Sequence, residues 1–121
     1  MNIIICDDRI DDRKNLSDLL SDYGEKKNYE FTITEYDSGE QLCEEQSALE
    51  ACQLLFLDIN MQGMDGLKTA MRIKEKYPKL PVVLVTAYMN YVLDGYKVKA
   101  SRFLLKDNLA DTIEECMDDL I

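Results

Sequence analysis

The chain has 121 residues, of which 46% are hydrophobic and 31% are charged, and its formal net charge is −10. This length and composition are typical of one globular domain and argue against a disordered chain. The negative charge argues against direct nucleic-acid binding, which requires a basic surface, and favours cations and basic protein surfaces as partners.

Residue usage excludes several further classes of function. No apolar run is long enough to span a membrane and no signal-peptide pattern opens the chain, so we expect a cytoplasmic protein. The chain contains no histidine, which removes most schemes based on a histidine base. Its four cysteines lack the C-x-x-C spacing of zinc sites, and we expect them to be reduced and at least partly buried: Cys6, Cys43, Cys52 and Cys116.

The first half of the chain alternates between strand and helix patterns. The apolar run at 2–6 predicts a buried strand, and a stripe at helical spacing predicts a helix at about 10–26, formed by Leu16, Leu19, Leu20 and Tyr23. Residues 30–36 alternate between apolar and polar positions, which indicates an edge strand with one half-solvated face. A helix is expected at about 39–49.

The second half continues the alternation. Apolar runs predict strands at 53–58, 81–86 and 102–105. A helix at 66–76 is expected to bury Leu67, Ala70, Met71 and Ile73. The helix expected at 90–98 has the weakest pattern, because only Val92 and Tyr96 are correctly spaced and Asp94-Gly95 lies inside it.

A last helix is expected at 108–120, with an apolar stripe formed by Leu109, Ile113, Cys116, Met117 and Leu120. The alternation of strands and helices predicts right-handed βαβ units in a three-layer α/β/α sandwich. The chain ends at Ile121, still on an apolar helical pattern. We therefore expect residues 1–121 to be one domain of a longer protein.

Chemically related residues follow four of the apolar runs. Asp7-Asp8, Asp58, Thr86 and Lys106 each stand at the end of a predicted strand. In an open parallel sheet, the carboxyl ends of the strands meet at one edge, where the functional crevice lies.

Each of these residues also has an ordinary interpretation, as a helix cap, a strand-end hydroxyl or a surface lysine. Taken together, they form the set that an aspartyl-phosphate site requires. A carboxylate that attacks phosphorus is repelled by the phosphoryl oxygens, so a divalent cation must offset that charge. Mg²⁺ prefers carboxylate, carbonyl and water oxygens as ligands. A lysine and a hydroxyl can then hold the remaining phosphoryl oxygens.

The chain resembles the receiver domain of bacterial two-component response regulators over essentially its whole length. The resemblance rests on Asp7-Asp8, the segment from Asp58 to Gly66, Thr86-Ala87 and the run from Phe103 to Lys106. It implies a flavodoxin-like fold, with a five-stranded parallel sheet of order 2-1-3-4-5. It also implies a phosphoryl-accepting switch that catalyses its own phosphoryl transfer and dephosphorylation and is otherwise not an enzyme.

The resemblance also implies a role for each site residue. Asp58 would be the phosphoacceptor, Asp8 a direct Mg²⁺ ligand, and Asp7 a support for the metal mainly through water. The backbone carbonyl of Asn60 would complete the metal site, in which Mn²⁺ could replace Mg²⁺. Thr86, Ala87 and Lys106 would bind the phosphoryl group. The Thr86 hydroxyl and the Phe103 ring would together act as the switch.

The implied partners are a sensor histidine kinase and, after phosphorylation, a second copy of the chain, with no membrane contact. The dimer face would comprise 90–98, 102–105 and 108–120. Residues 91–106 are similar to regulators of the LytTR class, which carry a β-rich DNA-binding domain after the receiver. DNA would then be reached only through that absent domain.

Two positions depart from the family pattern. Gln62 stands where proline is usual and is expected to loosen its loop. Asp107 stands where a cis proline usually follows the lysine, and a cis Lys106–Asp107 bond would cost about 3–4 kcal/mol.

Other functions remain open at this stage. The chain could be a stand-alone or degenerate receiver that acts as a protein-interaction module. An aspartyl-phosphate phosphatase or mutase is less favoured, because Asn60 stands where a second catalytic aspartate is needed. A flavodoxin-like nucleotide binder is also less favoured, because the turn after the first strand contains no glycine for phosphate.

Overall fold

The structure is a computed structural model that describes residues 1–87 and 99–121. Its strands are β1 (Asn2–Cys6), β2 (Thr32–Tyr36), β3 (Leu54–Asp58), β4 (Val82–Thr86) and β5 (Arg102–Leu105). Its helices are α1 (Ile10–Lys27), α2 (Gly39–Glu44), α3 (Gln46–Ala51), α4 (Gly66–Lys76), the 3₁₀ helix η2 (Lys106–Asn108) and α6 (Leu109–Leu120). None of the described helices is both long and apolar enough to cross a bilayer.

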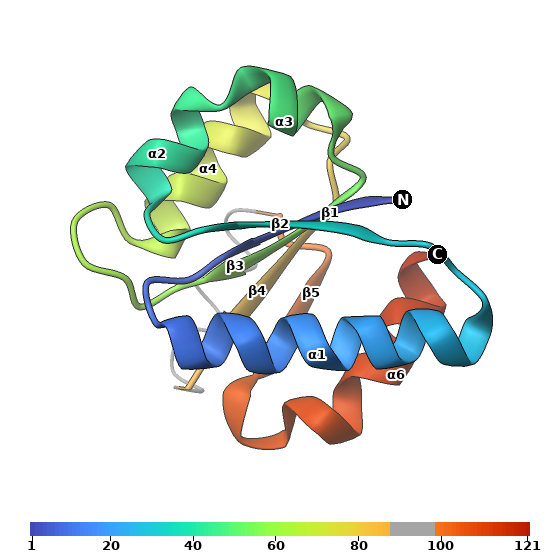
Figure 1. The fold of residues 1–121 in the computed structure, drawn as a ribbon. Helices are drawn as coiled ribbons and strands as arrows, with labels where there is room; N and C mark the ends of the chain where they lie inside the picture. The colour runs from blue at the N-terminus through green and yellow to red at the C-terminus, as the bar shows by residue number, and fades with distance from the viewer. Residues whose placement is uncertain (88–98) are drawn as a thin grey trace.

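The described strands form one five-stranded sheet in the order β2-β1-β3-β4-β5, and every neighbouring pair is parallel. Helices α1 and α6 cover one face of this sheet, and α2, α3 and α4 cover the other (Figure 1). The predicted three-layer sandwich and strand order are therefore confirmed. β2 lies at an edge of the sheet, as its alternating pattern indicated.

The face beneath α1 and α6 is packed by alternate residues of the central strands. Ile3 and Ile5 of β1 and Phe56 of β3 point into this layer and are almost fully buried. The helices contribute the stripes expected from the sequence: Leu16, Leu20 and Tyr23 from α1, and Leu109, Ile113, Cys116 and Met117 from α6. Burial of each large apolar side chain stabilises the folded state by roughly 1.5–3 kcal/mol. This packing holds both helices against the sheet.

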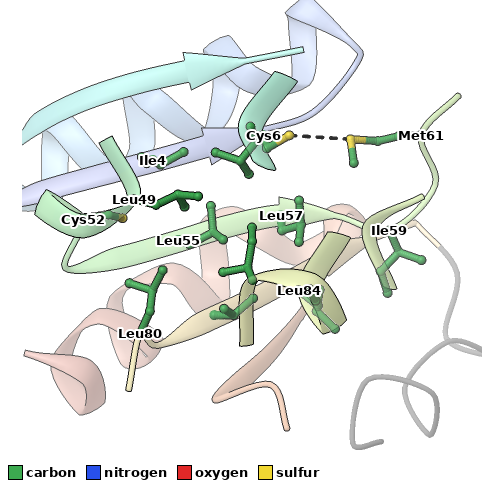
Figure 2. Close-up of a cluster of buried hydrophobic side chains, with 14 residues drawn as sticks. Ile4, Cys6, Leu49, Cys52, Leu55, Leu57, Ile59, Met61, Leu80 and Leu84 are labelled. Atoms are coloured by element: carbon green, nitrogen blue, oxygen red, sulfur yellow. Dashed lines mark hydrogen bonds between the residues drawn. The ribbon is translucent and has the colours of Figure 1, made fainter. Parts of the chain in front are cut away.

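The opposite face carries a second apolar cluster, shown in Figure 2. Ile4 and Cys6 of β1 and Leu57 of β3 point into it, opposite to their chain neighbours. The Cys6 thiol lies 3.9 Å from the Met61 sulfur, which packs the end of β1 against the loop that follows β3 (Figure 2). Because both faces of β3 and β4 are covered, these strands carry continuous apolar runs.

The prediction of one helix at 39–49 was wrong in one respect, because this segment forms two short helices, α2 and α3. The backbone leaves the helical conformation at Glu45, with φ −90° and ψ 67°. Leu42 of α2 and Leu49 of α3 then both reach the same buried cluster. No glycine or proline marks this break in the sequence, so periodicity alone did not predict it.

Met71 was also wrongly assigned to the buried stripe of α4, because its side chain is 52% exposed. The observed stripe is Gly66, Thr69, Ala70 and Ile73, which follows the spacing i, i+3, i+4 and i+7. Met71 lies one residue, and about 100° of helical rotation, beyond Ala70. The helix expected at 90–98 lies outside the described residues.

The four cysteines are free thiols, as expected. The pKa of Cys6 is raised to about 12, mainly by burial and in smaller part by the charges of Asp7 and Asp58. The pKa of Cys116 rises to about 11, again mainly through burial. Both thiols are therefore neutral packing groups near pH 7.

The close contact between α2 and α4 generates a stability prediction. A Cβ atom added to Gly39 would collide with the hydroxyl of Thr69, which is fully buried and bonded to the Asp65 carbonyl. We expect Gly39→Ala to lower the free energy of unfolding by about 1–3 kcal/mol in urea denaturation. Thr69→Ala removes the colliding atom, so the double variant should lose less than the sum of the two single losses. Simple additivity would contradict this account of the packing.

Candidate functional site

The ends of four adjacent strands bring the predicted site residues to one edge of the sheet. Asp7 and Asp8 follow β1, and Asp58 is the last residue of β3. Thr86 closes β4 opposite Leu105, and Lys106 is the next residue along the chain. The parallel register aligns these ends, so a site forms here without any contribution from the opposite edge.

Three carboxylates meet at this edge. Oxygen atoms of Asp7, Asp8 and Asp58 all lie within 4.8 Å of one another. Asp7 is 5% exposed and Asp58 only 2%, whereas Asp8 is half-buried. The Arg9 amide N–H donates to Asp7 Oδ1 over 2.9 Å. Negatively charged groups that are this close together and shielded from solvent repel each other strongly unless a cation lies among them.

Lys106 is the cation that lies beside this cluster. Its ammonium nitrogen lies 3.0 Å from Asp7 Oδ2 and 3.4 Å from Asp58 Oδ1. Its shortest contact, at 2.8 Å, is to Asp12 Oδ2 on the first turn of α1. One ammonium group therefore forms ion pairs with three carboxylates. Burial alone would lower the pKa of Lys106, but the hydrogen bonds with Asp12 and Asp7 and the charge of Asp58 raise it above its ordinary value.

Asp58 is the least compensated of these groups. Both of its carboxylate oxygens are buried, and neither has a hydrogen-bond partner of good geometry within 1–87 and 99–121. The pKa of Asp58 is raised from 3.8 to about 7, because burial and the charge of Asp7 both raise it and the Lys106 ammonium only partly offsets these two effects. In native folds a buried polar atom without a hydrogen-bond partner is explained by a bound water, an ion or ligand, or a functional role of the group.

The loop between β3 and α4 is held against the cluster from two sides. The Gln62 amide N–H donates to Asp8 Oδ2 over 3.0 Å. Proline has no N–H and could not make this bond. The expectation that Gln62 loosens the loop was therefore wrong, because its backbone ties the loop to Asp8.

The start of α4 is equally constrained. The Asp65 carboxylate caps the helix by accepting a hydrogen bond from the Lys68 amide N–H over 2.9 Å. A Cβ atom at Gly66 would collide with the Asp58 carbonyl, so only glycine lets α4 begin this close to the end of β3. This close contact between α4 and the end of β3 keeps the intervening loop beside the Asp58 carboxylate.

An open pocket gathers most of the remaining predicted residues. Its walls include Asp8, Asp58, Asn60, Ala87 and Lys106, together with Arg9, Asp12, Met61, Gln62 and Asp107. Thr86 is fully buried directly before Ala87. Phe103 lies on β5 opposite Leu84 and packs, half-buried, against the cluster of Figure 2. The described residues contain no cis peptide bond, so Lys106 reaches the site through a trans link to Asp107.

The donor set fits a small divalent cation. Three carboxylates converge, two of the buried oxygens lack a hydrogen-bond partner among the described residues, and an open pocket adjoins them. Hard cations such as Mg²⁺ prefer oxygen ligands of this kind and retain some of their waters. Asp58 and Lys106 both contribute to the wall of this pocket, with the ammonium nitrogen 3.4 Å from Asp58 Oδ1.

Two contributors were missed by the sequence analysis. Asp12 was not among the predicted site residues, but its carboxylate accepts a hydrogen bond from the Lys106 ammonium. Arg13 donates to the Asp7 carbonyl over 2.7 Å and lies 3.3 Å from Glu35 on β2, which braces the end of β1. Neither position follows an apolar run, and that was the signal that located the other site residues.

The raised pKa of Asp58 predicts a pH-dependent cost to stability in metal-free buffer. The folded state binds this proton more tightly than the unfolded chain does, so ionisation of Asp58 lowers the free energy of unfolding as pH rises from about 4 to 7. Asp58→Asn should therefore unfold with a free energy higher by on the order of 2 kcal/mol above pH 7, and this advantage should shrink toward pH 4.

Urea denaturation in the presence of a chelator, at several pH values, measures this difference. Asp11→Asn is a matched control, because Asp11 is exposed and makes no ion pair with any described residue. It should show no comparable pH-dependent gain. An Asp58→Asn variant less stable than the parent protein at pH 8 would contradict the interpretation.

Comparison with known proteins agrees with this geometry. Residues 3–118 match the family described as the response regulator receiver domain. The chain is 28% identical over 117 residues to the positive alginate biosynthesis regulatory protein of Pseudomonas aeruginosa, covering 97% of this chain and 46% of that protein. It is 29% identical over 117 residues to the sensory transduction protein LytT of Bacillus subtilis, with the same two coverages.

A solved structure shares the whole fold. The response regulator TrrA of Thermotoga maritima, in complex with Mg²⁺ and BeF, superposes with a TM-score of 0.83 and 26% identity, covering 99% of this chain and 98% of that one. The chain spans about half of the length of the two regulators above. The family match over 3–118, together with the fold, shows that this chain belongs to the response regulator receiver domain family.

Proposed function

We propose that Asp58 accepts a phosphoryl group and that the domain is the switch of a two-component system. The observation that carries the proposal is the convergence of Asp58 with the carboxylates of Asp7 and Asp8 and with the Lys106 ammonium at the edge of an open pocket. Asp58 is buried, its carboxylate oxygens have no hydrogen-bond partner among the described residues, and its Oδ1 atom lies 3.4 Å from the Lys106 ammonium. A carboxylate so placed is activated as a nucleophile once a cation offsets the surrounding charge.

Asp8, Asp58 and the backbone carbonyl of Asn60 would hold Mg²⁺, with Asp7 in support. When bound, the cation offsets the repulsion between the carboxylates and an incoming phosphoryl group. Support comes from the 4.8 Å cluster of carboxylate oxygens and from the similar TrrA structure, which contains Mg²⁺ and BeF. Asp8 keeps its orientation through the Gln62 amide.

The group transfer proceeds on Asp58 itself. One carboxylate oxygen forms a bond to the phosphorus of a phosphohistidine or a small acyl phosphate, and the bond from phosphorus to the donor breaks. The leaving nitrogen or oxygen keeps the electron pair. Lys106 pairs with a phosphoryl oxygen, and the Thr86 hydroxyl and the Ala87 amide bind the others. Attack by water later releases inorganic phosphate and restores the carboxylate.

Phosphorylation would be communicated through Thr86 and Phe103. The added group carries a charge of roughly −1.5 to −2, which draws the Thr86 hydroxyl and the Lys106 ammonium toward Asp58. The space vacated by Thr86 lets the half-buried Phe103 ring turn inward on β5. The output surface would include β5 and α6, and a homodimer through that surface is part of the proposal.

A sensor histidine kinase is the proposed donor, and a C-terminal effector domain, of the LytTR class, is the proposed output. The relatives support this indirectly: they are named as regulatory and sensory transduction proteins, and this chain spans about half of the two described above. With a net charge of −10, the receiver would contribute no DNA contact of its own.

The metal proposal predicts thermal stabilisation by Mg²⁺. A ligand that binds only the folded state stabilises it by mass action, so the melting temperature should rise by about 4 °C at roughly ten times the dissociation constant. Asp8→Ala should lose most of this rise. Sodium chloride of matched ionic strength controls for screening, and an unchanged melting curve in Mg²⁺ would remove the metal site.

The acceptor assignment predicts the product of acetyl phosphate and Mg²⁺. The intact protein should gain the mass of one phosphoryl group, and Asp58→Asn should gain none because it lacks the attacking charge. Asp65→Asn is a matched control in the same loop, since asparagine can also cap α4. Full labelling of Asp58→Asn in mass spectrometry would place the acceptor elsewhere.

A further inference from the structure

The Lys106 ammonium is held most closely by a residue outside the predicted site. Its distance to Asp12 Oδ2 is 2.8 Å, against 3.4 Å to Asp58 Oδ1. The contact with Asp12 is a hydrogen bond, whereas the contact with Asp58 lacks good hydrogen-bond geometry. Lys106 therefore faces the acceptor while it is bonded to another carboxylate.

Asp12 is firmly placed for this contact. It lies in the first turn of α1, and its side chain is only 35% exposed. Arg9 lies 3.4 Å from the same Oδ2 atom, but its side chain is 73% exposed, so solvent screens that pair more strongly. The Lys106 side chain is only 18% exposed. Its ion pair with Asp12 is therefore less exposed to solvent, and stronger, than the pair between Arg9 and Asp12.

We propose that Asp12 is a positioning residue that binds the Lys106 ammonium more closely than Asp58 does and competes with the phosphoryl group for it. The proposal rests on the function proposed above and adds a residue that sets the strength of the switch. A bound phosphoryl group must take Lys106 from Asp12 or share it, and the Asp12 charge also repels the phosphoryl oxygens. Both effects disfavour the phosphorylated state.

An ordinary structural role is the competing explanation. A carboxylate in the first turn stabilises a helix through the macrodipole whether or not it contacts Lys106. Asp11 separates the two explanations, because it is the adjacent carboxylate in the same first turn. It is exposed and makes no ion pair with Lys106. Asp11→Ala and Asp12→Ala therefore change the net charge and the helix start alike.

Beryllofluoride with Mg²⁺ is the probe, because it mimics the phosphoryl group and reports an equilibrium without group transfer. Its apparent affinity is measured by ¹⁹F NMR at fixed fluoride concentration. We expect Asp12→Ala to bind about fivefold more tightly than the parent protein, since a charged hydrogen bond no longer competes. Asp11→Ala should stay within about twofold.

A double-mutant cycle then tests whether Asp12 acts through Lys106. In a Lys106→Gln background, which itself should bind more weakly, adding Asp12→Ala should leave the affinity within about twofold. Equal gains in Asp11→Ala and Asp12→Ala, or a gain that persists without the lysine, would overturn the inference while the proposed function stands. Failure of the parent protein to bind the probe would instead overturn the proposed function, and this inference with it.

Discussion

The structure depends on one electrostatic constraint, the convergence of three carboxylates at the edge of a sheet where one ammonium lies beside them. Oxygens of Asp7, Asp8 and Asp58 lie within 4.8 Å of each other, and two of these residues are nearly fully buried. Such a cluster costs stability, because each charge loses water and faces the others. Favourable packing elsewhere in the fold must offset that cost. Binding of a cation or a change in the charge of the cluster would relieve the repulsion.

The two apolar clusters provide that compensation and also the geometry. Strands β1, β3 and β4 are packed on both faces, so their carboxyl ends cannot shift independently. The surrounding contacts are short and specific: Arg13 braces the Asp7 carbonyl, the Gln62 amide holds Asp8, and the absent side chain of Gly66 lets α4 approach Asp58. A rigid frame around an unfavourable charge cluster is the arrangement that a phosphorylation-driven switch requires.

The sequence predicted the fold and most of the site because both follow from apolar runs. Each buried strand is marked by its own residues, and the residue after it must lie at the sheet edge, which located Asp58, Thr86 and Lys106. What escaped prediction depends on tertiary contacts that leave no local pattern. The break at Glu45 reflects the packing of two leucines into one cluster, and the contact of Asp12 with Lys106 joins α1 to the end of β5. The expectation for Gln62 considered only the missing proline, whereas the backbone N–H that proline lacks makes a hydrogen bond to Asp8.

The most direct test of this account is the ionisation of Asp58 itself, followed by ¹³C NMR of the aspartate carboxyl carbons during a pH titration. In metal-free buffer the account predicts a carboxyl group that titrates near pH 7 and is absent from spectra of Asp58→Asn. Saturating Mg²⁺ should move this titration to lower pH, because a cation among the carboxylates favours the charged form. If Asp58 titrated near its ordinary value of 3.8 without metal, and Mg²⁺ left it unchanged, the uncompensated carboxylate cluster would be refuted.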